Sequence, residues 1–324
     1  MTRRIGHVHR SGPTLRPVSS AIASPVTSAR VAPSISAKVG GYIALTKPRI
    51  IELLLISTVP TMVVAERGLP SVWLMVATVI GGTLSAGGAN AINMYVDRDI
   101  DALMDRTKGR PLVTGVMTPR AALTFAIAIE ALSFGFLWVF VNLISAVLAV
   151  SACLFYVFVY TLWLKRTSER NIVIGGAAGA APVLIGWTAV TGRLDWAPVV
   201  LFAVMFYWTP PHFWALAIKY KDDYSRADVP MLPSVAAYAT VARKIVAYTV
   251  VVVALTVVFG VVAELGAVYH VSAGVLGAAF LWLAVKVQRT ESPAMAMRLF
   301  TYSITYITLL FGAMAVDVLV RFGA

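Results

Sequence analysis

Four polar residues at the end of a long apolar segment offer the clearest chemistry in this chain. Asn93, Asp97, Asp101 and Asp105 recur every four residues, so a helix that continued through them would present all four on one face. Carboxylates at this spacing repel one another, and a bound cation relieves that repulsion. Mg²⁺ usually takes one or two carboxylates and completes its shell with water and substrate phosphates. The stripe therefore predicts a magnesium site.

Basic residues accompany these acids. Arg98, Arg106, Lys108 and Arg110 lie in the same stretch of sequence. Acids for a metal and bases for a phosphate, together at the mouth of a membrane-length segment, predict a site for a magnesium-bound diphosphate. A solvated loop of mixed charge is the alternative, and the regular spacing of the acids disfavours it.

A second charged region follows the apolar residues around Trp208. It contains Lys221, Asp222, Asp223 and Arg226, and ionisable groups at the ends of membrane helices often mark function. Two acidic clusters on the same side of a membrane could hold one diphosphate between them through two metal ions. Charged loops are common, so the interpretation depends on the pairing of the two clusters.

Smaller features surround these regions. Lys47 and Arg49 begin one apolar segment and Lys165 ends another, where each could bind phosphate or anchor its helix at the membrane interface. His212 lies about two turns inside its segment, so it should face the interior of the bundle; a structural hydrogen bond is its alternative role. The small residues of 175–182 indicate close helix packing or a cavity wall that makes room for a large flat ligand.

Composition determines the class of protein. Hydrophobic residues form 59% and charged residues only 13% of the 324, and mean hydropathy is +0.81. Apolar segments of membrane-spanning length recur to the C-terminus. We predict an all-α polytopic membrane protein with about nine transmembrane helices, at 47–66, 71–95, 120–141, 144–164, 172–191, 197–218, 243–264, 268–286 and 299–320.

The basic residues predict the topology. Lys and Arg are abundant in every second connection, which puts 24 of the 27 on one side of the membrane. By the positive-inside rule, the N-terminus and the loops 97–120, 165–171, 219–244 and 286–298 are cytoplasmic and the C-terminus is external. This asymmetry accounts for most of the net charge of +12, so no nucleic-acid partner is needed. Anionic lipid or substrate would suit the charge equally well.

The N-terminal region differs from the rest of the chain. Residues 1–40 are rich in Arg, Ser, Ala and Pro and contain no acid. We expect a disordered basic tail there, with a transit peptide as the alternative, followed by one membrane domain over 41–324. The single cysteine, Cys153, lies in an apolar segment, so the chain has neither an internal disulfide nor a cysteine metal site.

These motifs resemble a known family. The run from Asn93 through Asp97-Arg-Asp-Ile-Asp101 to Arg110-Pro-Leu112 closely resembles the protohaem IX farnesyltransferases, a branch of the UbiA-type intramembrane prenyltransferases. The resemblance extends from about residue 42 to 320 and includes Leu45-Thr-Lys47-Pro-Arg49, Tyr160-Thr-x-Trp163-Leu-Lys165-Arg166, Asn171-Ile-Val-Ile-Gly175-Gly176, Pro211-His212-Phe-Trp214 and Lys221-Asp-Asp-Tyr224. The Asn-x₃-Asp-x₃-Asp element alone indicates only the superfamily, and the extended form is more specific.

One departure from the family pattern concerns the second acidic cluster. The superfamily often has a second Asp-x₃-Asp there, whereas in this chain Asp222 is followed four residues later by Arg226 and Asp223 by Ala227. Asp228 lies five residues after Asp223. The individual roles of these acids are therefore open.

The resemblance implies a UbiA-type bundle that transfers a farnesyl group from farnesyl diphosphate to the 2-vinyl group of haem b, giving haem O for haem-copper oxidases. It implies Mg²⁺ as cofactor, haem b as substrate, membrane lipid as surroundings and the downstream haem A synthase as partner, in a bacterial plasma membrane or a mitochondrial inner membrane. His212 becomes a candidate for contact with haem. The implied metal ligands are Asn93, Asp97, Asp101, Asp222 and Asp223, and the implied diphosphate ligands are Lys47, Arg49, Arg106, Arg110, Lys165, Lys221, Asp222 and Asp223.

Two other functions are compatible with parts of the sequence. A UbiA-type enzyme could prenylate a quinone or chlorophyll precursor, which the Asp-Arg-Asp-Ile-Asp block and the residues around His212 disfavour. A transporter could use broken helices and paired acids. It would need those acids near the membrane midplane, where only Glu130 is expected.

Overall fold

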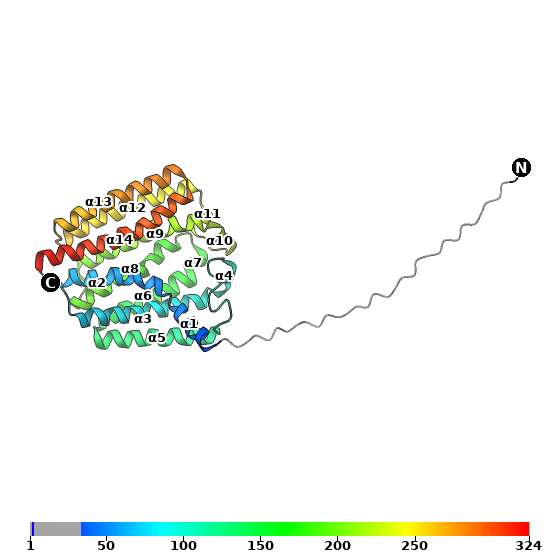
Figure 1. Ribbon diagram of the computed structural model, residues 1–324, viewed down its shortest axis with the longest axis horizontal. Coiled ribbons are helices and arrows are strands. Elements are labelled where there is room, and N and C mark those ends of the chain that lie inside the picture. Colours follow the sequence, from blue (N-terminus) through cyan, green and yellow to red (C-terminus); the bar gives the residue numbers. More distant parts are fainter. Residues whose placement is uncertain (1, 3–33, 324) are drawn as a thin grey trace. The chain divides into compact units, whose positions relative to one another are not determined.

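The computed structural model describes Thr2 and residues 34–323, but only the backbone of residues 49–55. This part of the chain is helical and contains no strand (Figure 1). Its longer helices are α1 (Ile35–Thr46), α2 (Pro48–Glu66), α3 (Val72–Val96), α5 (Pro119–Phe140), α6 (Leu143–Leu154), α8 (Asn171–Thr191), α9 (Trp196–Lys219), α12 (Tyr238–Val262), α13 (Ala267–Thr290) and α14 (Pro293–Phe322). The shorter ones are α4 (Arg98–Leu103), the π-helix η1 (Phe155–Leu164), α7 (Lys165–Thr167), α10 (Lys221–Arg226) and α11 (Leu232–Val235).

The protein is an integral membrane protein. Within the described residues, eight helices are long and apolar enough to cross a membrane, and α2 contributes a shorter apolar stretch, Ile56–Glu66. Each of the nine predicted segments therefore has a helix. Two begin earlier than predicted, α12 at Tyr238 and α14 at Pro293, because basic side chains such as Lys244 can stay within a helix and extend their charge toward water.

Local sequence explains where several helices begin. Ser71, Thr118 and Asn142 each accept a hydrogen bond from a backbone N–H of the following turn, as good N-cap residues do. Pro119 and Pro293 occupy first-turn positions, where proline removes no needed donor. The first helix also begins before the expected tail boundary, since α1 includes residues 35–40. Most of the predicted tail lies outside the described residues.

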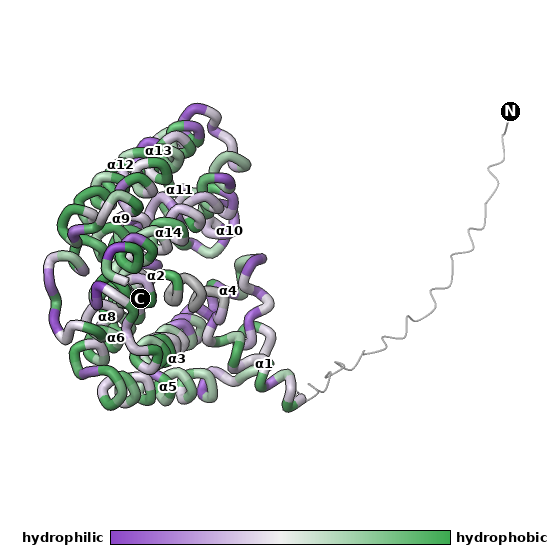
Figure 2. The backbone as a smooth tube through the Cα atoms, turned by 60° about the vertical axis from the view of Figure 1, so that its left-hand side comes forward, coloured by the Kyte–Doolittle hydropathy of each residue, from purple (hydrophilic) through white to green (hydrophobic). Residues whose placement is uncertain are grey.

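The spanning helices pack in chain order and close on themselves. The pairs α2–α3, α3–α5, α5–α6, α6–α8, α8–α9, α9–α12, α12–α13 and α13–α14 are all in contact, and α14 returns to α2. Figure 2 shows α9, α12, α13 and α14 as one group and α3, α5, α6 and α8 as another. Contacts of α8 with α2 and of α14 with α9 join the two groups.

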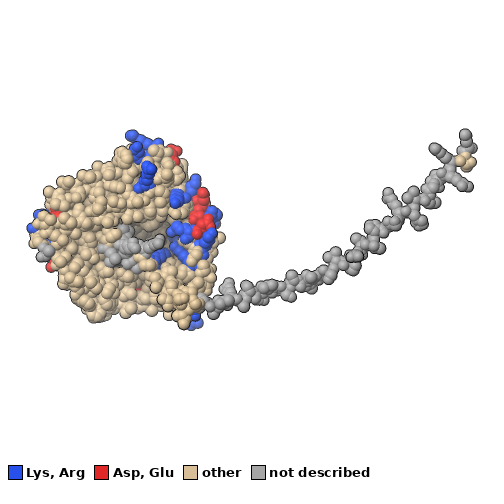
Figure 3. Space-filling model, in the orientation of Figure 1, with Lys and Arg blue, Asp and Glu red and all other residues tan. Residues whose placement is uncertain are grey.

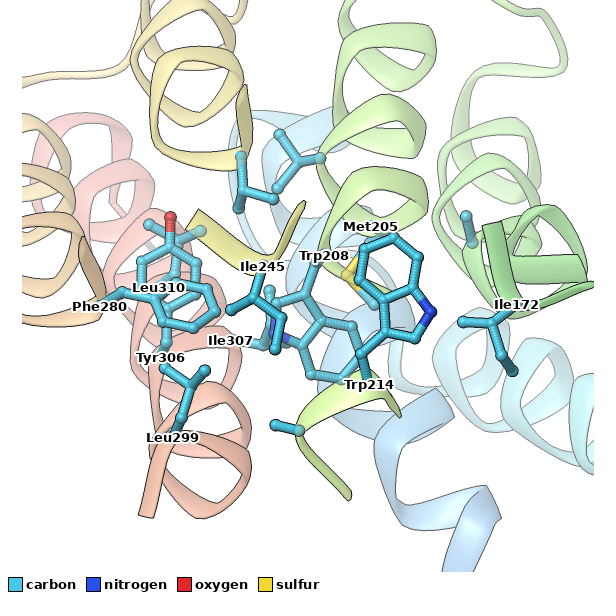
Figure 4. Packing of buried hydrophobic residues seen from close by; sticks show 14 of the residues in the cluster. Ile172, Met205, Trp208, Trp214, Ile245, Phe280, Leu299, Tyr306, Ile307 and Leu310 are labelled. Atoms are coloured by element: carbon cyan, nitrogen blue, oxygen red, sulfur yellow. The ribbon is translucent and has the colours of Figure 1, made fainter. Parts of the chain in front are cut away.

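The largest apolar core is centred on α9. Trp208 and Trp214 are almost completely buried. Figure 4 shows Trp208 near Tyr306 and Ile307 of α14, and Trp214 on the side toward Ile172 of α8. Many other large apolar side chains are exposed on the outside of the bundle, as expected where the surrounding solvent is lipid rather than water.

Glycines allow the closest helix contacts. A Cβ built on Gly176 of α8 would lie 2.9 Å from the Cβ of Thr209 on α9, and one on Gly175 would collide with the ring of Tyr160. The predicted close packing of residues 175–182 is therefore confirmed at these two positions. Gly179 has no such neighbour, so the small residues continue beyond the region of tight contact.

Candidate functional site

The acidic stripe is present over three of its four predicted members. The amide of Asp97 donates to the Asn93 carbonyl at 2.9 Å, and that of Asp101 donates to the Asp97 carbonyl at 2.8 Å. Helical hydrogen bonding therefore continues across the junction of α3 and α4, which places Asn93, Asp97 and Asp101 on one face. All three are buried.

The fourth member was predicted wrongly. Helix α4 ends at Leu103, and Met104 has an extended backbone, so Asp105 leaves the face that carries the other three. Its side chain is 67% exposed. A helical stripe requires an unbroken helix, and the predicted continuity fails here.

Basic side chains neutralise Asp97. Lys165 donates to its Oδ2, and Arg166 lies 3.6 Å from its Oδ1. The side-chain amide of Asn93 also donates to Asp97 at 2.7 Å and to the hydroxyl of Thr161 at 3.1 Å. A carboxylate this deeply buried is stable only when charged and polar groups surround it.

The helix that provides these partners has an unusual form. Residues 155–164 form the π-helix η1, and the Thr161 hydroxyl donates to the carbonyl of Tyr156, five residues earlier. Its wider turn changes which side chains face α3, so that Thr161 reaches Asn93 and Lys165 reaches Asp97. Departures of this kind are frequent at functional sites.

Lys47 enters the same site from another direction. It joins α1 to α2 in the left-handed backbone region, with φ of 52°, immediately before the proline that starts α2. A non-glycine residue there carries local strain that the surrounding fold must compensate. Its ammonium donates to Oδ1 of Asn93 at 2.9 Å.

Arg110 completes this arrangement from the loop after α4. Its guanidinium pairs with Asp101 at 2.5 Å, and the Thr107 hydroxyl donates to the Asp101 carbonyl at 2.9 Å. We use the name inner cluster for the cations and polar groups gathered in this way: Lys47, Asn93, Asp97, Asp101, Arg110, Lys165 and Arg166. Its four cations face two buried carboxylates, so the cluster can accept a further anion.

A second group of charges lies at the surface. Arg226 donates to Asp105 at 2.9 Å and also pairs with Asp223, and Lys108 pairs with Asp105 at 3.0 Å. We call Asp105, Lys108, Asp223 and Arg226 the outer cluster. Through Arg226 it links the loop after α4 to α10, two segments separated by 121 positions in sequence.

The two clusters are within electrostatic reach of each other. Tyr224 of α10 is buried, which raises the pKa of its hydroxyl, and Arg106 and Arg110 act in the opposite direction. Both arginines therefore lie near α10. Figure 3 shows most of the visible Lys, Arg, Asp and Glu side chains along one edge of the described part of the molecule, with a few at the opposite edge.

Several predicted residues lie apart from this arrangement. Lys221 and Asp222 are exposed, and Asp222 does not point inward as Asp223 does. The side chain of Arg49 lies outside the described residues. Within the described part of the chain, no group of three or more His, Cys, Asp or Glu could hold a metal ion, so the predicted five-ligand set is not assembled.

A smaller ligand set remains compatible with Mg²⁺. The Oδ1 atom of Asp97 is buried and has no hydrogen-bond partner among the described residues. Together with the amide oxygen of Asn93 it offers oxygen donors, and Mg²⁺ needs only one or two carboxylates when phosphates and water complete its shell. The donors present fit the metal in this form.

His212 lies elsewhere, between α9 and α14. Its Nδ1 shares a hydrogen bond of 2.7 Å with the hydroxyl of Ser303. The ring stacks on Trp208 at 4.4 Å and on Phe300 at 4.6 Å between centroids. Both faces are therefore covered, and only the ring edge could touch a ligand.

Sequence reasoning missed three contributors: Arg166, Thr161 and Arg226. Thr161 and Arg166 belong to the motif around Lys165 that carries the family resemblance. The sequence did not show which residues they contact. Arg226 was named in the second charged region and as a departure from the family pattern, but it was given no role in the site. Contacts across 68 to 121 positions, such as Lys165–Asp97 and Arg226–Asp105, leave no local signal.

Comparison with known proteins identifies the family of the chain. The model of the UbiA prenyltransferase family matches residues 54–311. The chain is 58% identical to protoheme IX farnesyltransferase from Parafrankia sp., covering 85% of this chain and 88% of that protein. It is 56% identical to the protein of the same name from Frankia alni, covering 87% and 99%.

Solved structures share the fold. A structure of digeranylgeranylglyceryl phosphate synthase superposes with a TM-score of 0.72 at 16% identity, over 87% of this chain and 98% of that one. A UbiA homolog from Archaeoglobus fulgidus bound to GPP and Mg²⁺ superposes with a TM-score of 0.57 at 17% identity, over 85% and 99%. At these identities the likeness concerns the fold alone.

Proposed function

This chain belongs to the UbiA prenyltransferase family, and we propose that it transfers a farnesyl group from farnesyl diphosphate to the 2-vinyl group of haem b. The products are haem O and diphosphate. The observation that carries this proposal is the 58% identity, over most of both chains, to a protein named for the reaction. The inner cluster supplies the chemistry that such a reaction needs.

Lys47, Arg110, Lys165 and Arg166 are the proposed diphosphate ligands. In the present arrangement they are paired with Asn93, Asp97 and Asp101, and an entering diphosphate would compete for them. Guanidinium groups bind phosphate oxygens in a bidentate manner, and lysine acts as a point charge. These four side chains would hold the leaving group at the end of α3. Arg106 is a further candidate, because it lies near Tyr224.

We propose Asn93 and Asp97 as the residues that hold Mg²⁺, with Asp101 and Asp223 as further candidates. The Archaeoglobus fulgidus homolog, which was solved bound to GPP and Mg²⁺, supports the use of this metal. The buried Oδ1 of Asp97, which accepts no hydrogen bond from the described residues, supports Asp97 as a ligand. Bound there, the ion would neutralise negative charge on the departing diphosphate. Lys221 and Asp222 are the weaker members of the predicted set, because both are exposed.

The remaining steps depend on positioning and on exclusion of water. Cleavage of the allylic carbon–oxygen bond leaves the electron pair on diphosphate, whose charge the inner-cluster cations stabilise. The vinyl carbon of haem b then forms the new carbon–carbon bond. Water adds to the resulting cation and loses a proton, which gives the hydroxyethylfarnesyl group. Apolar helix faces around the site would protect the allylic carbocation from premature reaction with water.

His212 remains a proposed haem contact, through its ring edge. Its position between Trp208 and Phe300 also suits a purely structural role.

The bacterial sources of the relatives support a location in the plasma membrane. With the basic loops inside, the inner cluster faces the cytoplasm, where farnesyl diphosphate is water-accessible.

The experiment that tests the function uses membranes containing the full chain. They are incubated with haem b, farnesyl diphosphate and Mg²⁺, and the extracted haem is analysed by mass spectrometry. We expect haem O, and none in membranes without the chain. Farnesylation of a quinone precursor without any haem O would refute the proposed acceptor.

A further inference from the structure

A cavity of about 420 Å³ lies between α8, α9 and α12, apart from the inner cluster. Its polar lining consists of Glu169, Arg170, Lys244 and Tyr248, and Trp214 forms an apolar wall. None of these residues belongs to the inner or outer cluster. The proposed function therefore leaves this cavity without a role.

The charges around the cavity favour an anion. Arg170 and Lys244 are the cations, and the one acid, Glu169, pairs only loosely with Lys244, at 3.8 Å between partly exposed side chains. Arg170 is also the N-cap of α8, a helix of 21 residues whose cap makes no side-chain hydrogen bond. The N-terminus of a helix adds partial positive charge and N–H donors that bind phosphate.

A buried donor in the same wall has no partner. The indole nitrogen of Trp214 makes no hydrogen bond within the described residues, although the residue is only 2% exposed. Figure 4 shows this nitrogen on the side of Trp214 that faces α8, the helix that contributes Val173 and Ile174 to the lining of the cavity. A buried N–H without an acceptor is costly, and an anionic oxygen would satisfy it.

The positions of the lining residues along their helices indicate which chemical class of anion the cavity would bind. Arg170 and Lys244 lie toward the helix ends that also carry the inner cluster, whereas Val173, Ile174 and Trp214 are apolar. Ile174 is exposed, so it is available to contact lipid chains. A charged rim above an apolar wall matches a phosphate headgroup with its acyl chains, and basic pockets between membrane helices bind such headgroups.

We propose that this cavity binds the phosphate headgroup of an anionic membrane lipid. Arg170, Lys244 and the start of α8 hold the phosphate, the indole N–H of Trp214 donates to one of its oxygens, and the acyl chains follow the apolar surface of α8. This site does not depend on the catalytic function proposed above.

Binding is measured on the purified full chain in detergent by native mass spectrometry, with phosphatidylglycerol compared with phosphatidylcholine of the same acyl chains. We expect phosphatidylglycerol to bind more tightly. Arg170→Ala with Lys244→Ala should weaken it by roughly fivefold for each cation removed. Trp214→Phe should weaken it while preserving the aromatic packing, and Glu169→Gln should strengthen it, because the competing carboxylate is gone.

Arg243→Ala is the matched control. Arg243 neighbours Lys244, is exposed and does not line the cavity, so its loss should leave binding unchanged. Equal binding of the two lipids, or an equal effect of Arg243→Ala, would overturn the proposal. Inorganic phosphate that displaces the lipid at equal concentration would assign the cavity to a free anion instead. Glu169→Gln is expected to increase the affinity for phosphatidylglycerol, so this variant still tests the proposal if the double variant does not fold.

Discussion

Replacement of Asp97 by asparagine tests the inner cluster most directly. The side chain is fully buried and contacts Lys165, Arg166 and Asn93. Asparagine has nearly the same volume but no charge, so it removes the electrostatic function without leaving a cavity. If Asp97 stabilises the leaving group through a metal, transfer should fall by about 10²–10³-fold.

The same change affects stability, and the magnitude follows from burial. Removal of one partner of a buried ion pair costs about 3–5 kcal/mol because the other charge is left unpaired. Lys165 is 14% and Arg166 32% exposed, and Arg166 keeps its pair with Asp99, so we expect the lower end of that range. Haem O formation must therefore be measured alongside a thermal unfolding curve in detergent.

Asp99→Asn provides the matched control. Asp99 pairs with the same arginine at 2.7 Å but is 59% exposed, and its pKa is lowered to about 2, chiefly by the hydrogen bond from Arg166. An exposed pair contributes about 0–1 kcal/mol, so activity should change little. Full activity of Asp97→Asn, or equal losses in the two variants, would refute the reasoning.

Four further outcomes are expected. Lys47→Met should weaken farnesyl diphosphate binding, measured by calorimetry, with haem binding unchanged; a loss of haem binding instead would contradict its role at the diphosphate. Chelation by EDTA should abolish haem O formation and added Mg²⁺ should restore it, whereas undiminished turnover in EDTA would exclude the metal. His212→Ala should alter the Soret spectrum of bound haem and lower the haem O yield while affinity for farnesyl diphosphate stays the same, and an unchanged spectrum with full activity would remove His212 from the site. In a chain without Cys153, a cysteine at Lys108 should resist an impermeant reagent applied from outside and one at Ala324 should react; the reverse pattern would invert the topology.

The positions of the membrane helices were predictable because their signal is local. About twenty consecutive apolar residues suffice to define a spanning helix, and all nine predicted segments have helices. The spacing of Asn93, Asp97 and Asp101 was equally local, since a helix repeats its face every three to four residues. Sequence could not locate the break at Met104, where the backbone becomes extended and Asp105 leaves the stripe.

The sequence by itself determined the class of protein, the helices, the charged ends and, through its resemblance, the family. Only the tertiary structure decided which cation meets which acid. Lys47 reaches Asn93 across 46 positions, and Lys165 reaches Asp97 across 68, from the end of a π-helix. Such pairs depend on how helices distant in sequence are packed and rotated. That packing is set by the summed contacts of the whole bundle, whereas hydropathy and spacing are properties of one segment.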